Sequence, residues 1–415
     1  MSTQNHATVR QRYGGRITGG IILATESTAE MMKRMAAWKR CSITGIAAVL
    51  TIGALLLATG CGDFFVPETS SSGGSTSGGD YVYIANQTTG TLSAYSVGSG
   101  ALTAISGSPY SLGFAPNAAA VNPANTIVFV SGTNSGIGFI DAFSIGSSGS
   151  LSLLAQNNVS LGDPISLAVS PDGQWLLGLD ANGLTIDEYQ INSSTGQLTL
   201  ATGAAYSITD APVVPRGIRI SPNGSFVFAA VGTAGDLVFP FNTSNGVLSS
   251  PGRLKLPSNV SDNALAVSAD SAYLFVARSG SGGGLAIYTV DSAGVLNPVS
   301  NSPFTAGSQP FSVVVNSAGT AAYVANQLDA TISGYTIASG GNATAISGSP
   351  FTNNSEPSGL VIDKSGKYLL AISNAGAPDL TLYSFDSTAT GKLNFISSTS
   401  TGSDPTGPVS IAATH

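Results

Sequence analysis

Residues 214–224 read VPRGIRISPNG, and this stretch decides the fold. It predicts a short apolar strand followed by a tight turn, because the closing Pro-Asn-Gly is typical turn chemistry. A strand that begins near a proline and ends in a glycine-containing turn recurs along the chain at a nearly fixed spacing. This copy alone carries two arginines, Arg216 and Arg219. The recurrence predicts the fold, and the arginines indicate where a site lies.

Seven similar units follow one another from Tyr81 onward, each 46 to 51 residues long. Every unit contains three apolar strands and then a fourth strand, which a proline leads in most units. The units begin at Tyr81, Ile127, Trp175, Phe226, Tyr273, Ala321 and Tyr368. Four strands repeated at a period of about 40 to 50 residues are typical of a propeller. We therefore expect an all-β, seven-bladed β-propeller of four-stranded blades.

The two ends of the repeat are expected to join. In a propeller the strand before the turn is normally innermost, so it belongs to the blade that follows it. Residues 409–413 then form an inner strand without a blade, and residues 81–106 supply three strands without an inner partner. Their pairing closes the ring and removes an open sheet edge.

The inner strands align without gaps, and two neighbouring columns differ in size. One column is apolar throughout: Ala119, Leu167, Ile218, Leu265, Val313, Leu360 and Ile411. The next is small or β-branched except for Arg219: Ala120, Ala168, Arg219, Ala266, Val314, Val361 and Ala412. Successive residues of a strand point to opposite faces. Each blade is therefore expected to pack a bulkier face against the smaller face of its neighbour.

Residues 31–61 have the pattern of an export signal, with basic residues before an uncharged apolar run. The run ends LATGC at 57–61, which resembles a bacterial lipobox and predicts lipid attachment at Cys61. A plain transmembrane anchor is the alternative, because the run approaches the ~20 residues that span a bilayer. We expect an N-terminal extension and signal peptide (1–60), a lipid-attached cysteine with a Gly/Ser-rich tether (61–80), and the propeller (81–415). Both interpretations place the protein in the bacterial cell envelope, on the periplasmic or surface side.

Charge and histidine content exclude several classes of function. Residues 41–415 hold eight basic and 20 acidic side chains, a net charge of −12, which argues against nucleic-acid binding. His6 and His415 are the only histidines, and neither position suits a Ser-His-Asp triad or a histidine metal site. We expect no cofactor and no metal, a monomer, and a small-molecule ligand or an exported glycan or protein as partner.

Charged side chains gather at the predicted channel mouth. The tops of the inner and second strands surround this mouth, and Asp180, Arg216 and Arg278 fall there on the third, fourth and fifth blades. Arginines suit a carboxylate or another oxyanion, so these three are the candidate catalytic residues. The same columns give Asn86, Asn117, Asn263 and Asn326 as candidate ligand-binding residues, and Arg219, deeper on the strand of Arg216, is a further one. The alternative is structural, with Asp180 paired to Arg216 and Arg219 paired locally.

The seven units, the Ser-Pro-Asp-Gly turn at 170–173 and the Pro215-Arg216 pair resemble the lactonase-family propellers. That family contains 6-phosphogluconolactonases and muconate-lactonising cycloisomerases, and the resemblance implies a site at the mouth built from arginine, histidine and an acid. Arg216 matches the family's Pro-Arg-His motif, but Gly217 stands where the histidine belongs. Residues 229–231 read AAV where the family has an Asn-Glu pair.

Two functions follow from these observations. The first is a lactone hydrolase or a binder of a small acidic or sugar-like ligand, in which Arg216 and Arg278 polarise the oxyanion and Asp180 activates water. The second is a non-catalytic, extracytoplasmic scaffold that binds a glycan or a protein. The missing histidines and the export signal favour the second, and the family resemblance favours the first.

Overall fold

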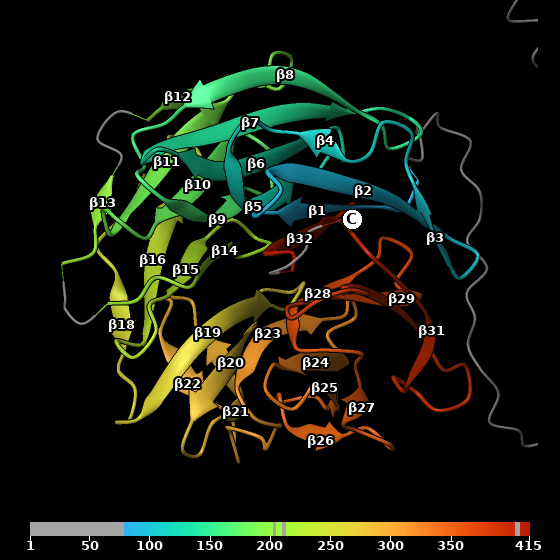
Figure 1. Ribbon diagram of the computed structural model, residues 1–415. Coiled ribbons are helices and arrows are strands. Elements are labelled where there is room, and N and C mark those ends of the chain that lie inside the picture. Colours follow the sequence, from blue (N-terminus) through green and yellow to red (C-terminus); the bar gives the residue numbers. More distant parts are fainter. Residues whose placement is uncertain (1–78, 202–204, 210–212, 403–406) are drawn as a thin grey trace, which may run out of the picture. The chain divides into compact units, whose positions relative to one another are not determined.

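The computed structural model describes residues 79–201, 205–209, 213–402 and 407–415. All regular secondary structure in these residues is β-strand, arranged as seven antiparallel sheets around a central channel (Figure 1). The predicted seven-bladed β-propeller is confirmed. The described residues contain no helix of the length and hydropathy needed to cross a membrane.

The blades are numbered here in chain order, and their strands are given from the innermost outward. Blade 1 consists of β32 (Ser410–Ala413), β1 (Tyr81–Asn86), β2 (Thr91–Gly98) and β3 (Ala101–Ala104), with β4 (Tyr110–Ser111) also beside β2. Blade 2 consists of β5 (Ala115–Val121), β6 (Ile127–Asn134), β7 (Ile137–Ile145) and β8 (Leu151–Asn158). Blade 3 consists of β9 (Pro164–Val169), β10 (Trp175–Asp180), β11 (Thr185–Ile191) and β12 (Leu198–Leu200), with β13 (Tyr206–Ser207) beside β11. Blade 4 consists of β14 (Gly217–Ile220), β15 (Phe226–Ala230), β16 (Asp236–Asn242) and β17 (Val247–Leu248), with β18 (Gly252–Leu254) beside β16.

The remaining three blades follow the same order. Blade 5 consists of β19 (Val260–Val267), β20 (Tyr273–Gly280), β21 (Gly284–Val290) and β22 (Leu296–Pro298). Blade 6 consists of β23 (Pro310–Val315), β24 (Ala321–Asn326), β25 (Thr331–Ile337) and β26 (Ala343–Ala345), with β27 (Phe351–Thr352) beside β25. Blade 7 consists of β28 (Pro357–Ile362), β29 (Tyr368–Ser373), β30 (Leu380–Phe385) and β31 (Leu393–Thr399).

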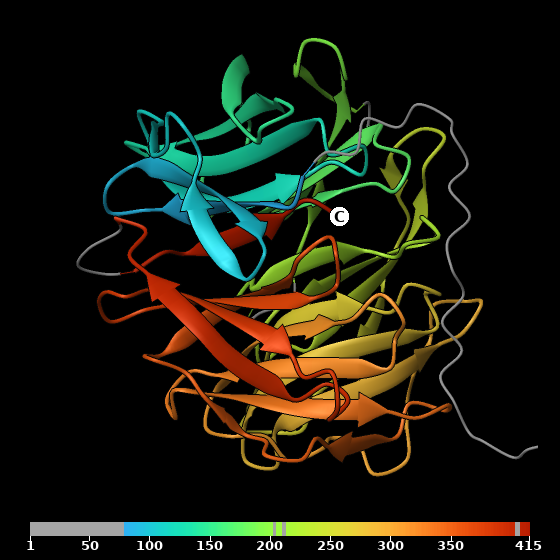
Figure 2. The ribbon, with the colours of Figure 1, turned by 90° about the vertical axis from the view of Figure 1, so that its right-hand side faces the viewer.

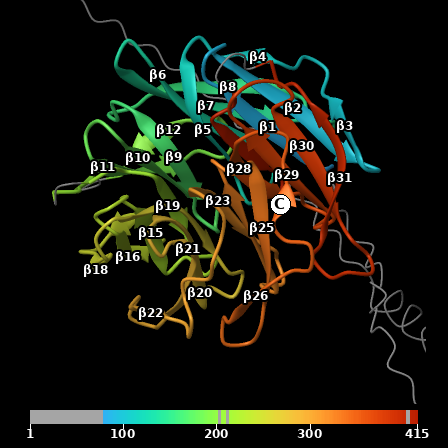
Figure 3. The same cartoon turned by 60° about the horizontal axis from the view of Figure 1, so that its bottom comes forward.

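The ring closes through the last strand, as the sequence predicts. β32 pairs antiparallel with β1, and Ile84 lies opposite Ile411 in this register. Beyond the strand, the backbone N–H of Thr414 donates to the carbonyl of Tyr81 at 3.0 Å. Strands from the beginning and the end of the propeller accordingly lie side by side in blue and red (Figures 2 and 3). Blade 1 is thus assembled from both ends of the repeat.

Hydrophobic cores lie between adjacent blades, and they follow the predicted alternation of sizes. Ala264 and Ala266 of blade 5 pack with Val313 and Val315 of blade 6. The same relation recurs between blades 3 and 4, where Ala168 meets Ile218. The inner strands therefore place a bulky face against a small face, and their upper ends converge on the channel.

Candidate ligand-binding site

The inner strands of all seven blades surround a central cavity of about 300 Å³. Its polar lining comes from strand starts at the channel mouth and from residues deeper in the channel. These polar residues are Asn117, Ser166, Arg216, Arg219, Asn263, Ser312, Ser358 and Ser410. Among the described residues that line the cavity there are two arginines and no carboxylate or histidine. The lining is therefore positively charged, although the chain as a whole is acidic.

Arg216 lies immediately before β14, and its side chain is exposed. Its backbone N–H donates to the carbonyl of Ala230 at 2.9 Å, which fixes the residue at the top of blade 4. Within the described part of the chain, no carboxylate pairs with its guanidinium group. Arg216 therefore presents an uncompensated charge and a set of hydrogen-bond donors to the channel.

Arg219 lies on the same strand, three residues further along, and it also reaches the cavity. Its Nη1 donates to the carbonyl of Ile218 at 2.8 Å. The side chain is accessible to solvent, yet the surrounding strands remove much of the bulk water, and this desolvation lowers the pKa of Arg219. An arginine remains charged at neutral pH even so. The channel thus holds two arginines whose backbone positions are about 10 Å apart along the strand.

Three serines add further hydrogen-bond donors that sequence reasoning missed. The Oγ atoms of Ser166, Ser312 and Ser410 each accept a backbone N–H from the inner strand of the next blade. The donors are Ile218 at 3.2 Å, Leu360 at 3.1 Å and Ala119 at 3.1 Å. A hydroxyl whose oxygen already accepts one bond still has a proton to donate to a ligand. These serines share one column of the aligned inner strands, and this alignment is the signal that could have found them.

Asn117 and Asn263 line the cavity, as their columns predict, but both amides are already bonded. Asn117 donates to Asp163 at 2.7 Å and accepts from Gln87 at 2.6 Å. Asn263 donates to the carbonyl of Pro310 at 2.8 Å. These bonds fix the two amides at the mouth, and a primary amide has a second N–H and a second lone pair for a ligand.

Asp180 differs from the expectation that it lies beside Arg216. Its side chain is 2% exposed and does not line the cavity. The carboxylate instead accepts four backbone N–H groups, from Gly162, Asp163, Asn182 and Gly183 at 2.7 to 3.0 Å. The pairing of β10 with β9 shifts register between Leu179 and Asp180. Asp180 therefore organises two loops, and its pairing with Arg216 is not observed.

Arg278 also lies away from the cavity, buried between blades 4 and 5. It forms a two-pronged ion pair with Asp262, with Nε–Oδ1 and Nη2–Oδ2 distances of 2.6 and 2.7 Å. Burial alone would lower the pKa of Arg278, but the hydrogen bonds and charge of Asp262 raise it above its ordinary value. Asp236 is buried nearby, and desolvation and the charge of Asp262 raise its pKa. The expected cluster of Arg278 with Arg216 at the mouth is replaced by this buried pair.

Asn86 and Asn326 are the remaining candidates, and both are fully buried at the ends of β1 and β24. Asn86 donates to Ser93 at 2.9 Å, and Asn326 donates to Ser333 at 2.9 Å. Neither lines the channel cavity, so they hold the hairpins of blades 1 and 6 together. Cys61, the predicted lipid-attachment residue, lies outside the described residues.

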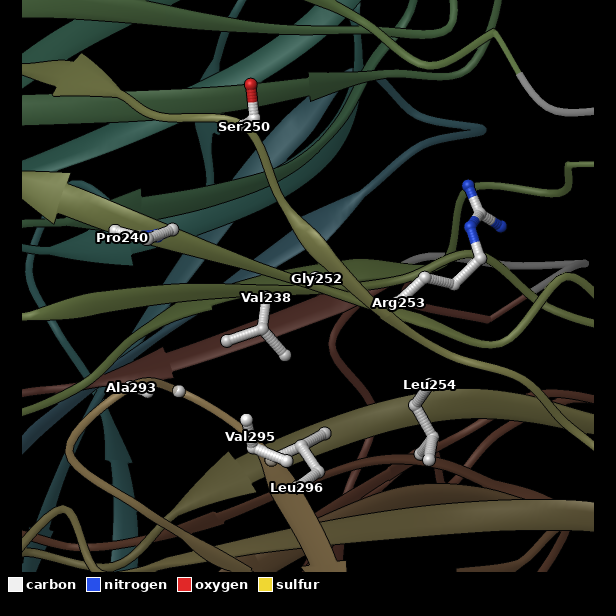
Figure 4. Close-up of a pocket in the computed structure, with 10 residues that line it drawn as sticks. Val238, Pro240, Ser250, Gly252, Arg253, Leu254, Ala293, Val295 and Leu296 are labelled. Carbon is white, nitrogen blue, oxygen red and sulfur yellow. The ribbon is translucent and has the colours of Figure 1, made fainter.

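A second cavity of about 310 Å³ lies on the outer side of blades 4 and 5 (Figure 4). Val238, Val295 and Leu296 face it, whereas the Arg253 side chain points away. It shares no lining residue with the channel. Among the described residues, no group of three histidine, cysteine or acidic side chains could hold a metal ion.

The fold and the channel define a seven-bladed β-propeller with an arginine-lined central cavity. Residues 264–411, about a third of the chain, match the family described as "Lactonase, 7-bladed beta-propeller". No curated protein matches the sequence.

Several solved structures share the fold. A Bacteroides uniformis protein described provisionally as a 6-phosphogluconolactonase is 16% identical, with a TM-score of 0.68 over 81% of this chain and 99% of that one. The periplasmic gluconolactonase of Pseudomonas aeruginosa is 15% identical, with a TM-score of 0.65 over 81% of this chain and 99% of that one. A Lactobacillus plantarum protein is 17% identical, with a TM-score of 0.67 over 81% of this chain and 100% of that one.

Proposed function

We propose that this propeller binds a small acidic ligand in its central channel through Arg216 and Arg219. The observation that carries the proposal is a cavity of about 300 Å³ that holds two arginines and, in the described lining, no carboxylate. Guanidinium groups form strong paired hydrogen bonds with carboxylates and other oxyanions. An acidic ligand would supply the negative charge that the channel lacks.

The size and the donors of the cavity narrow the class of ligand. About 300 Å³ lies at the lower end of the range for small-molecule pockets. The hydroxyls of Ser166, Ser312 and Ser410 can donate to additional oxygen atoms of the same ligand. A compact, oxygen-rich acid such as a sugar acid satisfies these donors.

Lactone hydrolysis is the second candidate, and the family match over residues 264–411 favours it. We propose that the whole propeller belongs to this lactonase family. Arg216 and Arg219 would stabilise the oxyanion that develops on the lactone carbonyl. Hydrolysis also needs a group that activates water, and Asp180 is engaged with four backbone N–H groups. Ligand binding is therefore the function that the geometry supports best.

The proposal also includes attachment to the cell envelope through a lipid on Cys61. This rests on the sequence of residues 31–61, which lie outside the described residues. Metabolic labelling with a palmitate analogue tests it, because label should appear on the wild-type protein and disappear from Cys61→Ser. Equal labelling of the two proteins would contradict lipid attachment at this residue.

Titration calorimetry with D-gluconate tests the main proposal. Arg216→Ala removes an exposed side chain, so the protein should fold normally and lose at least about tenfold in affinity, as expected for loss of a charge-assisted hydrogen bond. Arg253→Ala is the matched control, because Arg253 lies on β18 beside the outer cavity and does not line the channel.

Two outcomes would contradict the proposal, one concerning the site and the other concerning catalysis. Unchanged gluconate binding in Arg216→Ala would contradict the assigned site. Hydrolysis of D-glucono-δ-lactone above the uncatalysed rate, reduced in Arg216→Ala, would establish the hydrolase instead of a binding module.

A further inference from the structure

A second polar hollow lies at the channel-mouth end of blades 1 and 2, with a cavity volume of about 490 Å³. Three connections form its walls: the turn between β1 and β2, the link between β4 and β5, and the turn between β6 and β7. Gln87, Thr89, Ser111, Asn134 and Ser135 line it, and all five are exposed. The hollow is therefore open to solvent and built by loops on a rigid sheet scaffold.

The lining carries amides and hydroxyls and, in the described residues, no charged side chain. Amide and hydroxyl groups both donate and accept hydrogen bonds. Alcohol groups of a ligand have the same dual character, whereas a carboxylate or phosphate accepts only. The chemistry of this hollow consequently suits a neutral, polyhydroxylated ligand, in contrast to the arginine-lined channel.

An aromatic residue of the hydrophobic core between blades 1 and 2 also lines the hollow. Phe114 lines the hollow and is 6% exposed, and its ring stacks on Phe139 with a centroid distance of 5.6 Å. At the wall, Asn134 donates to the carbonyl of Gly113 at 3.1 Å, and Ser135 donates to Asn134 at 3.0 Å. These two contacts fix polar groups of the wall, which can donate to and accept from the hydroxyls of a sugar.

The hollow adjoins the channel through one hydrogen bond. Gln87 lines the hollow, and its Nε2 donates at 2.6 Å to Oδ1 of Asn117, which lines the channel cavity. A ligand seated in the hollow would lie beside the channel mouth without contacting Arg216 or Arg219.

We propose that this hollow is a binding site for a neutral oligosaccharide, separate from the acid site in the channel. Gln87 and Asn134 are the residues that hydrogen-bond the sugar hydroxyls. The hollow is open, so the affinity is modest and the site accepts the end or the middle of a chain.

Saturation-transfer NMR on the full chain tests this with maltotriose, cellotriose and xylotriose as neutral probes and trigalacturonate as the acidic probe. At least one neutral trisaccharide should bind, and the double variant Gln87→Ala/Asn134→Ala should lose at least about tenfold in affinity because two hydrogen-bonding groups are gone. Gln190→Ala/Asn297→Ala is the matched control, because both residues are exposed on outer strands away from the hollow.

A second variant keeps the test independent of those side chains. Ser111→Trp places a large ring in the hollow from an exposed strand position and should block the sugar while the protein stays folded. Binding should persist in Arg216→Ala, which separates this site from the channel. The proposal would be overturned if no neutral probe binds, or if the Gln87/Asn134 and Ser111 variants bind the sugar as tightly as the wild-type protein does. Tighter binding of trigalacturonate than of the neutral probes at the hollow would also overturn it.

Discussion

Arg216, Arg219 and Arg278 carry the same charge, but their surroundings separate their roles. Arg278 is buried and paired with Asp262, whereas Arg216 is exposed at the channel mouth without a described carboxylate partner. The paired and buried charge of Arg278 links β20 to β19 within blade 5. An uncompensated charge in a cavity remains available to a ligand.

This difference predicts a large loss of stability for one arginine-to-alanine substitution and almost none for the other. Arg278→Ala leaves Asp262 buried without its partner and should lower the free energy of unfolding by about 3–5 kcal/mol. Arg216→Ala removes an exposed side chain and should change it by about 0.5 kcal/mol or less. Urea denaturation followed by tryptophan fluorescence measures both values. Equal destabilisation by the two substitutions would contradict the assignment of roles.

Glu188 makes stability depend on pH. Burial raises the pKa of this carboxyl from its ordinary value of 4.5 to about 7, so the folded protein binds a proton there that the unfolded chain has released. Its contribution to stability is complete below about pH 4.5 and is lost as the pH rises towards 7. The loss is about 1.4 kcal/mol per pH unit within that window.

Glu188→Gln should flatten this part of the pH dependence, because glutamine does not titrate. The measurement is the urea midpoint at pH 5, 6, 7 and 8 for both proteins. The difference between the two proteins should change between pH 5 and 7 and stay constant above that. A constant difference at every pH would show that Glu188 is already ionised in the folded state.

At the scale of single residues, column alignment of the sequence located only part of the site. Arg216, Asn117 and Asn263 line the channel as their columns predict, and Arg219 lines it deeper on the same strand. Asp180 does not line it, because its carboxylate accepts N–H groups of the two neighbouring loops. Repeat alignment gives a position along a strand, whereas the partners of a side chain at a strand end depend on the loops beside it, which differ from blade to blade.

The element that closes the ring is β32, a strand of four residues. It is the inner strand of blade 1 and pairs with β1 through four residue pairs, from Val82–Ala413 to Ala85–Ser410. Deletion of residues 408–415 removes it and exposes the inner edge of β1 to solvent. The deletion should lower the melting temperature of the whole propeller, since blade 1 then has no inner strand.

Deletion of His415 alone is the control, because it leaves β32 intact. Differential scanning calorimetry compares both deletions with the full chain. A protein that lacks residues 408–415 but melts like the intact one would contradict the role of the closing strand.

At the scale of elements, the sequence predicted far more than it did for side chains. The seven expected unit starts coincide with the first residues of β1, β6, β10, β15, β20, β24 and β29. The period was readable because each unit repeats the same alternation of apolar runs and turns. The additional strands β4, β13, β18 and β27 were not predicted, because two or three residues are too few to show a period of two.

At the scale of the whole molecule, the propeller brings seven similar strands together around one cavity and lets one of them differ. Six inner strands contribute neutral side chains to the cavity, and blade 4 contributes Arg216 and Arg219. The chain from residue 41 onward carries a net charge of −12, so the positive channel is a local exception in an acidic protein. This local positive charge in the channel is the basis of the proposed acid site.

A crystal structure of the full chain with D-gluconate tests that site most directly. We expect electron density for the ligand in the central channel, with its carboxylate in hydrogen-bond contact with the guanidinium group of Arg216 or Arg219. Density for gluconate elsewhere on the protein, with an empty channel at saturating ligand, would contradict it.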